Sequence, residues 1–149
     1  MEYLIRRVAF ADLSRLVQLC AKHADYEGAD YDSTGKQERL AAELFSESRR
    51  LHCHVIERAG SIEGYFTFTL DFSTWDARPF LHLDCLYLEP NLRGQGIGKQ
   101  IFQQLEQIAR ELECFNIQWQ TPITNEPAIR FYDRLGATGR DKKRYGLAL

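Results

Sequence analysis

The stretch Arg93-Gly94-Gln95-Gly96-Ile97-Gly98 places three glycines at alternate positions between an apolar strand-like run and an amphipathic helical pattern. Glycine lets a backbone approach a ligand closely and adopt positive φ. The first N–H groups of the helix that follows have no partners within the helix, and they attract anions. The stretch therefore predicts a cradle for a phosphate group, with a pyrophosphate as the expected ligand. A plain tight turn is the structural alternative.

Two familiar phosphate loops do not match this spacing. A P-loop places four residues between its first glycine and a Gly-Lys pair, and Ser or Thr follows. Here Gly98-Lys99 lies one residue too close to Gly94, and Gln100 follows. A dinucleotide-binding loop has the order G-x-G-x-x-G near the start of a βαβ unit. The cradle is therefore of another type.

His52-Cys53-His54 contains three potential metal ligands. In a strand, successive side chains point to opposite faces, so the two imidazoles share one face and Cys53 lies on the other. No Cys-x-x-Cys or His-Glu-x-x-His spacing supplies the remaining ligands. We predict no metal site.

Strand and helix patterns must position the cradle. Alternating apolar residues predict strands at Tyr3–Val8, Leu51–Glu57, Gly64–Asp71, Phe80–Leu88, Phe115–Thr121 and Arg144–Leu149. Helical periodicity predicts a first helix capped by Asp12, a second with a capping box of Thr34 and Gln37, a third from Gly98 to Leu112, and a fourth entered through Asn125-Glu126-Pro127 and ended by Gly136. The acidic segment Asp25–Asp32 is predicted to be a loop between the first two helices.

The composition limits the number of domains, the partners and the cellular location that we expect. The 149 residues, 44% of them hydrophobic, fit a single domain with its own core. A net charge of -2 and a pI near 6.1 argue against nucleic-acid and membrane partners. Arg6 and Arg7 interrupt the first apolar residues, so no signal peptide is expected. The four cysteines lie in apolar patterns, which suits reduced thiols and a cytoplasmic location.

Two stretches resemble the GNAT superfamily of acetyltransferases. Arg93-x-x-Gly96-x-Gly98 resembles its coenzyme A loop, and Asn125-Glu126-Pro127-Ala128-Ile129-Arg130-Phe131-Tyr132, followed by Leu135-Gly136-Ala137, resembles its last helix. Within the superfamily the chain is most similar to the diamine (spermidine/spermine) and thialysine acetyltransferases. Further matching features are Ala21-Lys22, Tyr26-Glu27, Leu51-His52-Cys53 and Leu83-Asp84.

This resemblance covers nearly the whole chain and implies a fold and an activity. The fold is α/β (α+β): one mixed, mostly antiparallel twisted sheet, splayed between its fourth and fifth strands, with helices on both faces, in a single domain over residues 1–149. The implied activity is transfer of acetyl from acetyl-CoA to a primary amine of a small molecule, a polyamine or a lysine-like amino acid, by direct attack and without a metal. A homodimer is also implied. The alternatives are an aminoglycoside or peptide amine as acceptor, or a catalytically silent acyl-CoA-binding regulatory module.

The resemblance also implies roles for individual residues. Tyr132 matches the proton donor to the leaving thiolate, and Asp84 matches a glutamate that accepts protons from the amine. Tyr26 and Glu27, with Asp84, match substrate-contacting positions. The matching cofactor positions are Leu86, Tyr87, Leu88, Arg93, Gly94, Gln95, Gly96, Ile97, Gly98, Lys99, Asn125 and Arg134.

The chain departs from the family pattern at two of these regions. Cys85 stands where the family has an aspartate, and Leu135 stands where it has an arginine. Structural alternatives remain open for the candidates: a hydrogen-bonded strand end for Asp84, a core aromatic for Tyr132, and a solvated acidic loop around Glu27. Trp75 is expected to line the acceptor pocket or to belong to a dimer surface.

Overall fold

The computed structural model describes residues 2–149 and divides them into two compact units, one that ends at Trp119 and one of Gln120–Leu149. The first unit contains the whole sheet and the helices of the amino-terminal part. The second contains a single helix, α4, at Glu126–Arg134. Each unit is described by itself.

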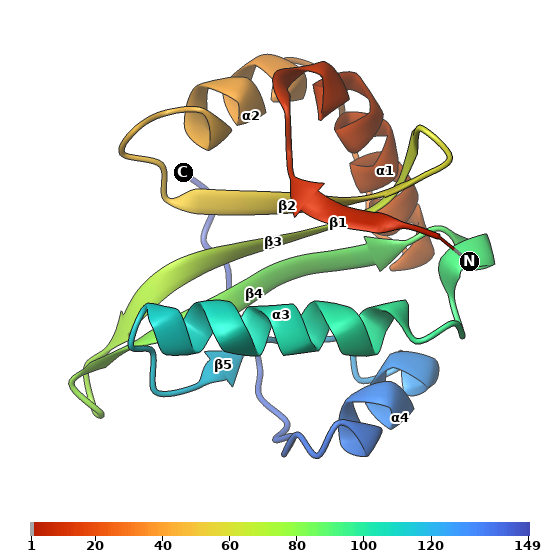
Figure 1. Ribbon diagram of the computed structural model, residues 1–149. Coiled ribbons are helices and arrows are strands. Elements are labelled where there is room, and N and C mark those ends of the chain that lie inside the picture. Colours follow the sequence, from red (N-terminus) through yellow and green to blue (C-terminus); the bar gives the residue numbers. More distant parts are fainter. Residues whose placement is uncertain (1) are drawn as a thin grey trace. The chain divides into compact units, whose positions relative to one another are not determined.

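One five-stranded sheet with the order β1-β2-β3-β4-β5 forms the centre of the first unit (Figure 1). The strands β1 to β4 are antiparallel neighbours, and β5 runs parallel to β4. Ala59 and Gly60, both with positive φ, form the tight turn between β2 and β3, as a two-residue hairpin turn requires. The strand bounds are β1 Leu4–Arg7, β2 Leu51–Arg58, β3 Ser61–Ser73, β4 Arg78–Leu88 and β5 Ile117–Gln118.

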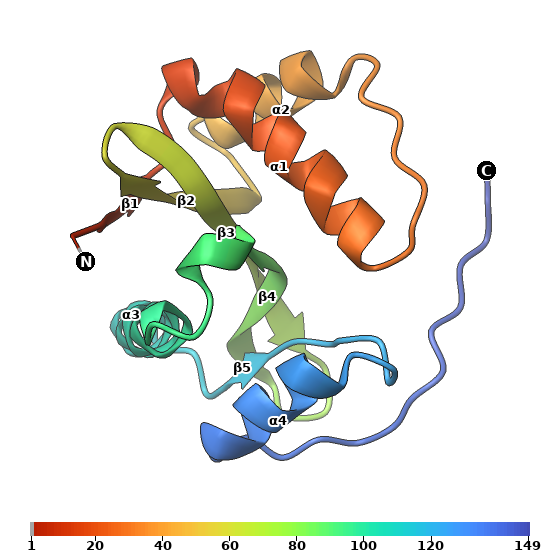
Figure 2. The same cartoon turned by 90° about the vertical axis from the view of Figure 1, so that its right-hand side faces the viewer.

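Helices cover both faces of this sheet. Figure 2 shows α1 (Leu13–Tyr26) and α2 (Lys36–Leu44) on one side and α3 (Ile97–Glu111) on the other. Leu13, Leu16 and Leu19 of α1 are buried in one cluster with Tyr65 and Tyr87 of the sheet. The predicted stripe of α3 is confirmed, since its buried residues are Ile97, Ile101, Phe102, Leu105 and Ala109. The predicted fold class is thereby confirmed.

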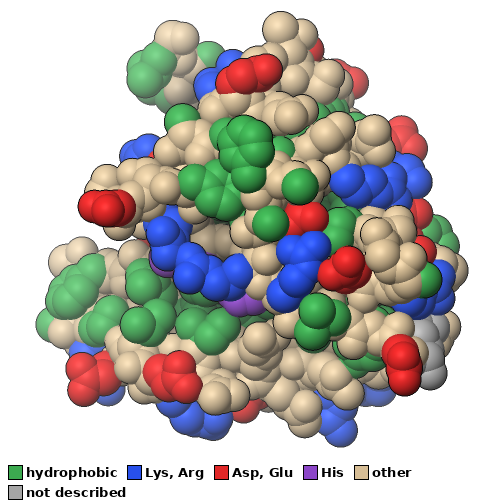
Figure 3. Space-filling model, turned by 45° about the horizontal axis from the view of Figure 1, so that its top comes forward, with side chains coloured by type: hydrophobic (Ala, Val, Ile, Leu, Met, Phe, Trp, Pro, Cys, Tyr) green, Lys and Arg blue, Asp and Glu red, His purple; other side chains and the backbone are tan. Residues whose placement is uncertain are grey.

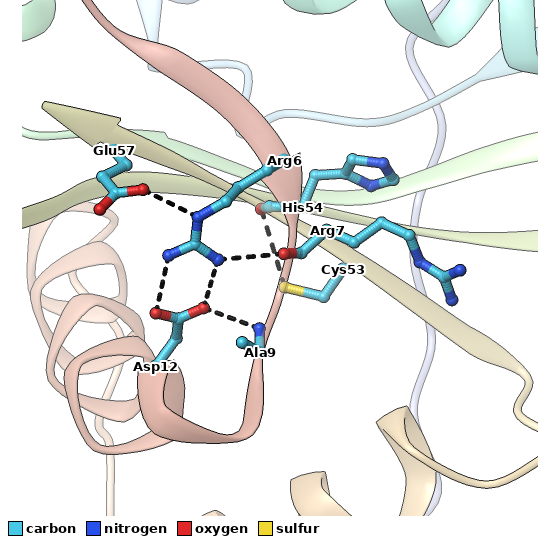
Figure 4. Close-up of polar contacts among 7 residues, drawn as sticks. All are labelled: Arg6, Arg7, Ala9, Asp12, Cys53, His54 and Glu57. Carbon is cyan, nitrogen blue, oxygen red and sulfur yellow. Dashed lines mark hydrogen bonds and ion pairs between the residues drawn. The ribbon is translucent and has the colours of Figure 1, made fainter.

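Asp12 connects β1 to the start of α1, and this role differs from the predicted helix cap. A short 3₁₀ turn, Phe10–Asp12, precedes α1, and no side chain caps the helix itself. The Asp12 carboxylate instead accepts hydrogen bonds from the Arg6 guanidinium at 2.8 and 3.0 Å and from the Ala9 N–H at 2.7 Å (Figure 4). Arg6 donates from its Nε to Glu57 as well. The side chain that could cap the helix is thus held by an arginine.

The predicted strand Arg144–Leu149 is wrong. Residues 138–149 have no regular structure, and Tyr145 and Leu147 are 83% and 90% exposed. Apolar alternation forms a strand only where a sheet edge takes up the main-chain N–H and C=O groups, and no edge among the described residues pairs with this segment. The predicted strand Phe115–Thr121 is longer than β5, which has only two residues.

Two predicted details around α2 also differ. The capping box of Thr34 and Gln37 does not form, because α2 begins after Gly35, which has a φ of 71°. The Thr34 N–H is bonded to the Asp32 carboxylate at 3.0 Å instead. In the segment predicted as a loop, α1 continues through Tyr26.

Candidate active site

A β-bulge on β4 sets the position of Asp84. Cys85 pairs with Thr67 and Leu83 pairs with Phe68, so Asp84 is the extra residue of β4 at this point. Strict alternation would place residues 81, 83, 85 and 87 on one face. Cys85 and Tyr87 pack with the core under α1, whereas Leu81 and Leu83 are buried outside that cluster. The bulge therefore changes the face to which the side chains of β4 point, and it leaves Asp84 exposed at the change. Bulges next to active sites often re-aim a side chain in this way.

Beyond the bulge, β4 has an unpaired edge. β5 pairs with β4 only at Leu81 and His82, so no strand among residues 2–149 pairs with the far side of residues 83–88. The Glu89 N–H donates to Glu63 of β3. Main-chain direction alternates along a strand, so the groups of Leu88 and Leu86 face the open edge. The predicted splay between β4 and β5 is thus confirmed.

The glycine stretch leads from this edge into α3. Gly94 and Gly96 have φ of 72° and 81°, and a Cβ on either would meet nothing within 4 Å. The glycines are thus required by backbone conformation and not by lack of space. Gly96 is the N-cap of α3, and no side chain caps this end. The first N–H groups of a 15-residue helix therefore remain available to an anion above an open loop.

The Arg93 side chain connects the glycine stretch to α1. Its Nε donates to the Leu88 carbonyl at 2.9 Å. Its guanidinium lies 4.7 Å from the Tyr26 ring and 5.5 Å from the Tyr87 ring. Arg93, which is expected to lie beside the pyrophosphate, thus also contacts the ring of Tyr26, the last residue of α1. Tyr87 itself is 7% exposed, so only its main chain is open to a ligand.

Sequence reasoning missed His23 and Tyr65, which join the candidate residue Glu27 to the core. His23 Nε2 lies 3.3 Å from the Glu27 carboxylate, and its Nδ1 lies 2.9 Å from the Tyr65 hydroxyl. The His23 ring also packs 5.4 Å from the ring of Tyr87. The spacing of His23 and Glu27, one helical turn, was the one signal in the sequence.

Two thiols lie beside Tyr65 and Asp84. Burial raises the pKa of Cys85 to about 12, and the neighbouring Asp84 carboxylate adds to the effect. Burial also raises the pKa of Cys20. Cys85 Sγ lies 3.7 Å from Asp84 Oδ2. Cys85 therefore stays protonated at neutral pH and supplies no negative charge at the position where the family has an aspartate.

The second unit holds the remaining candidates on or next to α4. Asn125 is its N-cap and accepts a hydrogen bond from the Ala128 N–H at 3.4 Å, and Pro127 lies in the first turn. Gly136, with a φ of 86°, follows the helix. The predicted entry and end of the helix are confirmed. Tyr132, whose ring lies 5.6 Å from that of Phe131, and Arg134 lie on α4.

The described residues show no metal centre. Among residues 2–149 no group of three or more His, Cys, Asp or Glu side chains could hold a metal ion. Cys53 packs under α1, while His52 and His54 stack on Phe68 and Phe66. The expected division of this segment between two faces is confirmed. A surface pocket of about 480 Å³ lies elsewhere, against Glu2, Tyr3, Leu4, Ile5 and Gln100.

Comparison with known proteins identifies the family. The sequence model described as "Acetyltransferase (GNAT) family" matches residues 14–137. The chain belongs to this family. It is similar to the thialysine N-epsilon-acetyltransferase of Bos taurus, with 28% identity over 142 residues that cover 90% of this chain and 83% of that enzyme. The predicted resemblance to GNAT and thialysine acetyltransferases is thus confirmed, and this GNAT protein is an N-acetyltransferase.

Two other comparisons are more limited. The peptidyl-lysine N-acetyltransferase YjaB of Salmonella typhimurium is 36% identical over 63 residues, which cover 41% of this chain and 40% of that enzyme. A crystal structure described as a transcriptional regulator from Bacillus halodurans has a TM-score of 0.84 and 22% identity, and the match covers 99% of this chain and all of that one. The structural likeness supports the fold. No helix among the described residues is long and apolar enough to cross a membrane.

Proposed function

We propose that this GNAT enzyme transfers the acetyl group of acetyl-CoA to a primary amine of a small molecule, a lysine-like amino acid or a polyamine. One observation carries the proposal: the bulge exposes Asp84 on β4 just before an unpaired main-chain edge that leads to the uncapped start of α3. A carboxylate, a row of main-chain donors and acceptors, and an anion-binding helix end are what an acetyl-CoA-dependent amine acetylation needs.

The donor side of the proposal assigns acetyl-CoA to the edge and the cradle. N–H groups of residues 94–99 bind the pyrophosphate, and the open edge at Leu86 and Leu88 bonds the pantetheine arm as an added strand would. The absence of a side-chain cap on α3 supports this fit. Lys99, Arg93, Asn125 and Arg134 add contacts that the family resemblance implies.

The proposed reaction gives each proton a destination. Asp84 accepts a proton from the ammonium group, whose pKa of about 10.4 keeps it charged at neutral pH. The amine nitrogen attacks the thioester carbonyl carbon while the Leu86 N–H stabilises the developing oxyanion. The carbon–sulfur bond breaks, and the Tyr132 hydroxyl protonates the departing thiolate. The nitrogen then loses its second proton as the amide forms, and this proton restores the Tyr132 hydroxyl through water.

The charges around Asp84 favour an acceptor with few ammonium groups. Glu27, at the end of α1, lies 3.3 Å from His23, and on β4 Cys85 stays neutral because its pKa is raised to about 12. Asp84 is then the carboxylate left for the reacting ammonium at this point of β4. A lysine-like amine needs one such partner, whereas a polyamine carries several cationic groups. The thialysine acetyltransferases among the relatives support the same choice.

A thiol-release assay with acetyl-CoA and a panel of amines tests the proposal. Thialysine and lysine are expected to accelerate release most, followed by spermidine, with a lysine peptide and an aminoglycoside as weaker acceptors. Acceleration by the peptide above all others would favour a peptide amine, the acceptor class that the name of the Salmonella relative states. Tight acetyl-CoA binding without turnover on any amine would favour the silent regulatory module.

A cytoplasmic homodimer belongs to the same proposal. Its support is the family resemblance and the four free cysteines, of which Cys53 is buried. Light scattering of the purified enzyme measures the mass directly. A monomer at concentrations used for assay would contradict the dimer without affecting the proposed reaction.

A further inference from the structure

Arg7, His52 and His54 lie on the sheet face opposite α1, and Arg49 of the loop before β2 lies close enough to lower the pKa of His52. These four basic residues are here called the β2 cationic patch. Arg7 of β1 pairs in register with His54 of β2. Figure 4 shows the Arg7 and His54 side chains pointing to the same side, away from the Arg6, Asp12 and Glu57 group. Figure 3 shows lysine or arginine side chains gathered beside histidine on the face that it draws. The patch lies two strands away from β4.

Two phenylalanines hold the imidazoles of the patch in place. The His54 ring stacks on Phe66 at 5.0 Å and 5°, and the His52 ring stacks on Phe68 at 5.0 Å and 13°. Each ring rests on the apolar surface of β3 and presents only its edge to a polar ligand. The imidazole nitrogens are therefore ordered before any ligand binds.

Three acidic side chains close to the patch in sequence are engaged with other arginines, and Glu47, two residues before Arg49, is exposed to solvent. Asp12 and Glu57 bind Arg6, and Glu43 binds Arg50 at 2.7 Å. Within residues 2–149, neither Arg7 nor Arg49 forms an ion pair. The patch thus carries positive charge that the protein itself does not neutralise.

Two buried polar atoms of the patch also have no hydrogen-bond partner among the described residues: Arg49 Nε and His54 Nδ1. A buried guanidinium N–H without an acceptor costs about 1–3 kcal/mol, so such atoms are usually satisfied by a ligand, an ion or water. The two atoms come from the loop before β2 and from β2 itself. They are polar atoms of the patch that the described part of the protein itself leaves unpaired.

The pKa values of both histidines in the patch are lowered. Burial, together with the neighbouring Arg7 and His52, lowers the pKa of His54 to about 4. Burial and the charges of Arg49 and Arg7 lower the pKa of His52. Arg7 of β1 acts on both imidazoles, Arg49 of the loop before β2 acts on His52, and the α3 residues buried against the sheet are apolar. A bound anion would oppose this effect and favour imidazolium.

We propose that the β2 cationic patch binds a small phosphate-bearing anion at a site separate from the glycine cradle. A guanidinium pairs two N–H groups with two phosphate oxygens, so Arg7 and Arg49 suit a phosphate group. The imidazole edges supply further donors when protonated. The net charge of -2 disfavours a long polyanion such as nucleic acid. Free phosphate and a phosphate ester share this chemistry.

Imidazole NMR tests the proposal because the chain has four histidines, and His23 and His82 lie outside the patch. The apoenzyme is titrated with inorganic phosphate and with adenosine monophosphate, against chloride at matched ionic strength. Phosphate is expected to shift the His52 and His54 signals and to raise the pKa of His54 by about 1 or more. The response of His23 and His82 should equal that in chloride. A response to the ester alone would identify a nucleotide-like ligand as the source of the phosphate.

Variants that each remove one positive charge test which residues bind the phosphate. Arg7→Gln and Arg49→Gln are expected to reduce the His54 response at least tenfold in apparent affinity, while Arg50→Gln, whose arginine is already paired with Glu43, keeps it. Arg7 is exposed, so we expect Arg7→Gln to fold, and this variant tests phosphate binding even if Arg49→Gln does not fold. The proposal is overturned if His52 and His54 respond no more than His23 and His82, or if Arg7→Gln responds as the wild type does.

Discussion

Asp84 and Cys85 are adjacent in sequence but contribute different charges to the same region. Asp84 is exposed at the bulge, whereas burial holds Cys85 in its neutral form by raising its pKa to about 12. The substitution of a family aspartate by Cys85 therefore leaves one carboxylate at this point of β4. A lysine-like acceptor is favoured because one negative charge matches one reacting ammonium group.

Tyr132→Phe tests the proposed proton donor. The variant is expected to lower kcat by about 100-fold with a small change in acetyl-CoA affinity, because general acid catalysis contributes about that factor or more. Steady-state kinetics and direct binding of acetyl-CoA separate the two effects. Tyr145→Phe, in the exposed carboxyl-terminal segment, is the matched control and should keep the wild-type rate. An unchanged kcat in Tyr132→Phe would remove this residue from the mechanism.

The family resemblance predicted Asp84 as a candidate, but the sequence did not predict how it is exposed. The run Cys85-Leu86-Tyr87-Leu88 is apolar at every position, so no break in alternation reveals that the strand changes face. The bulge follows from pairing with β3, which is a tertiary property. The contact of His23 with Tyr65 escaped prediction for the same reason, because it joins residues 42 positions apart.

At the scale of elements, the Arg6–Asp12 pair fixes β1 against the start of α1. Asp12 is 8% exposed and accepts hydrogen bonds from both Arg6 and Ala9. Arg6 holds the pKa of the Asp12 carboxyl below its usual range, chiefly through these hydrogen bonds. The same contact diverts the Asp12 carboxylate, so Asp12 occupies the predicted N-cap position of α1 without making a capping hydrogen bond.

Asp12→Ala is expected to reduce the free energy of unfolding by about 2–3 kcal/mol at pH 7, since charged hydrogen bonds contribute about 1.5–3 kcal/mol each. The folded pKa of Asp12 is depressed, so its contribution is present above the unfolded pKa and is lost as pH falls through the folded value. Urea unfolding at several pH values should show the deficit shrinking below about pH 4. Glu106→Ala, in an exposed helical pair with Arg110, should cost less than about 0.5 kcal/mol. Equal deficits at pH 7 and at pH 2 would contradict this account.

The cradle depends on backbone conformation at the start of α3. Gly96→Ala forces a side chain into a φ of 81°, at a cost of about 1–2 kcal/mol. We expect acetyl-CoA affinity to fall about tenfold as the loop relaxes to another conformation. Gly60→Ala, at a φ of 78° in the β2–β3 turn and with equally open surroundings, carries the same strain away from the cradle. Equal acetyl-CoA affinities for the two variants, measured by titration calorimetry, would show that the loop conformation does not matter for binding.

At the scale of the whole molecule, periodicity identified the four α-helices of residues 2–149 and the strands β1 to β4 of their sheet. The helices and β1 to β4 bury one-sided stripes or alternate faces, and such patterns are visible in sequence. The two failures, the strand at Arg144–Leu149 and the extent of β5, concern strands at the carboxyl-terminal side. Whether such segments pair depends on which edge they meet, and a local pattern does not contain that information.

The central proposal is that this GNAT enzyme uses Asp84 to deprotonate a small amine. The most direct measurement is the pH dependence of thiol release from acetyl-CoA, with thialysine as acceptor, for the wild type, Asp84→Asn and Asp71→Asn. Asp71 lies on β3 away from the bulge and controls for the loss of one negative charge. We expect kcat/KM of Asp84→Asn to fall about 100-fold or more at neutral pH. It should recover at higher pH, where the amine is deprotonated in solution. Asp71→Asn should behave as the wild type. A wild-type rate for Asp84→Asn across the whole pH range would contradict the proposal.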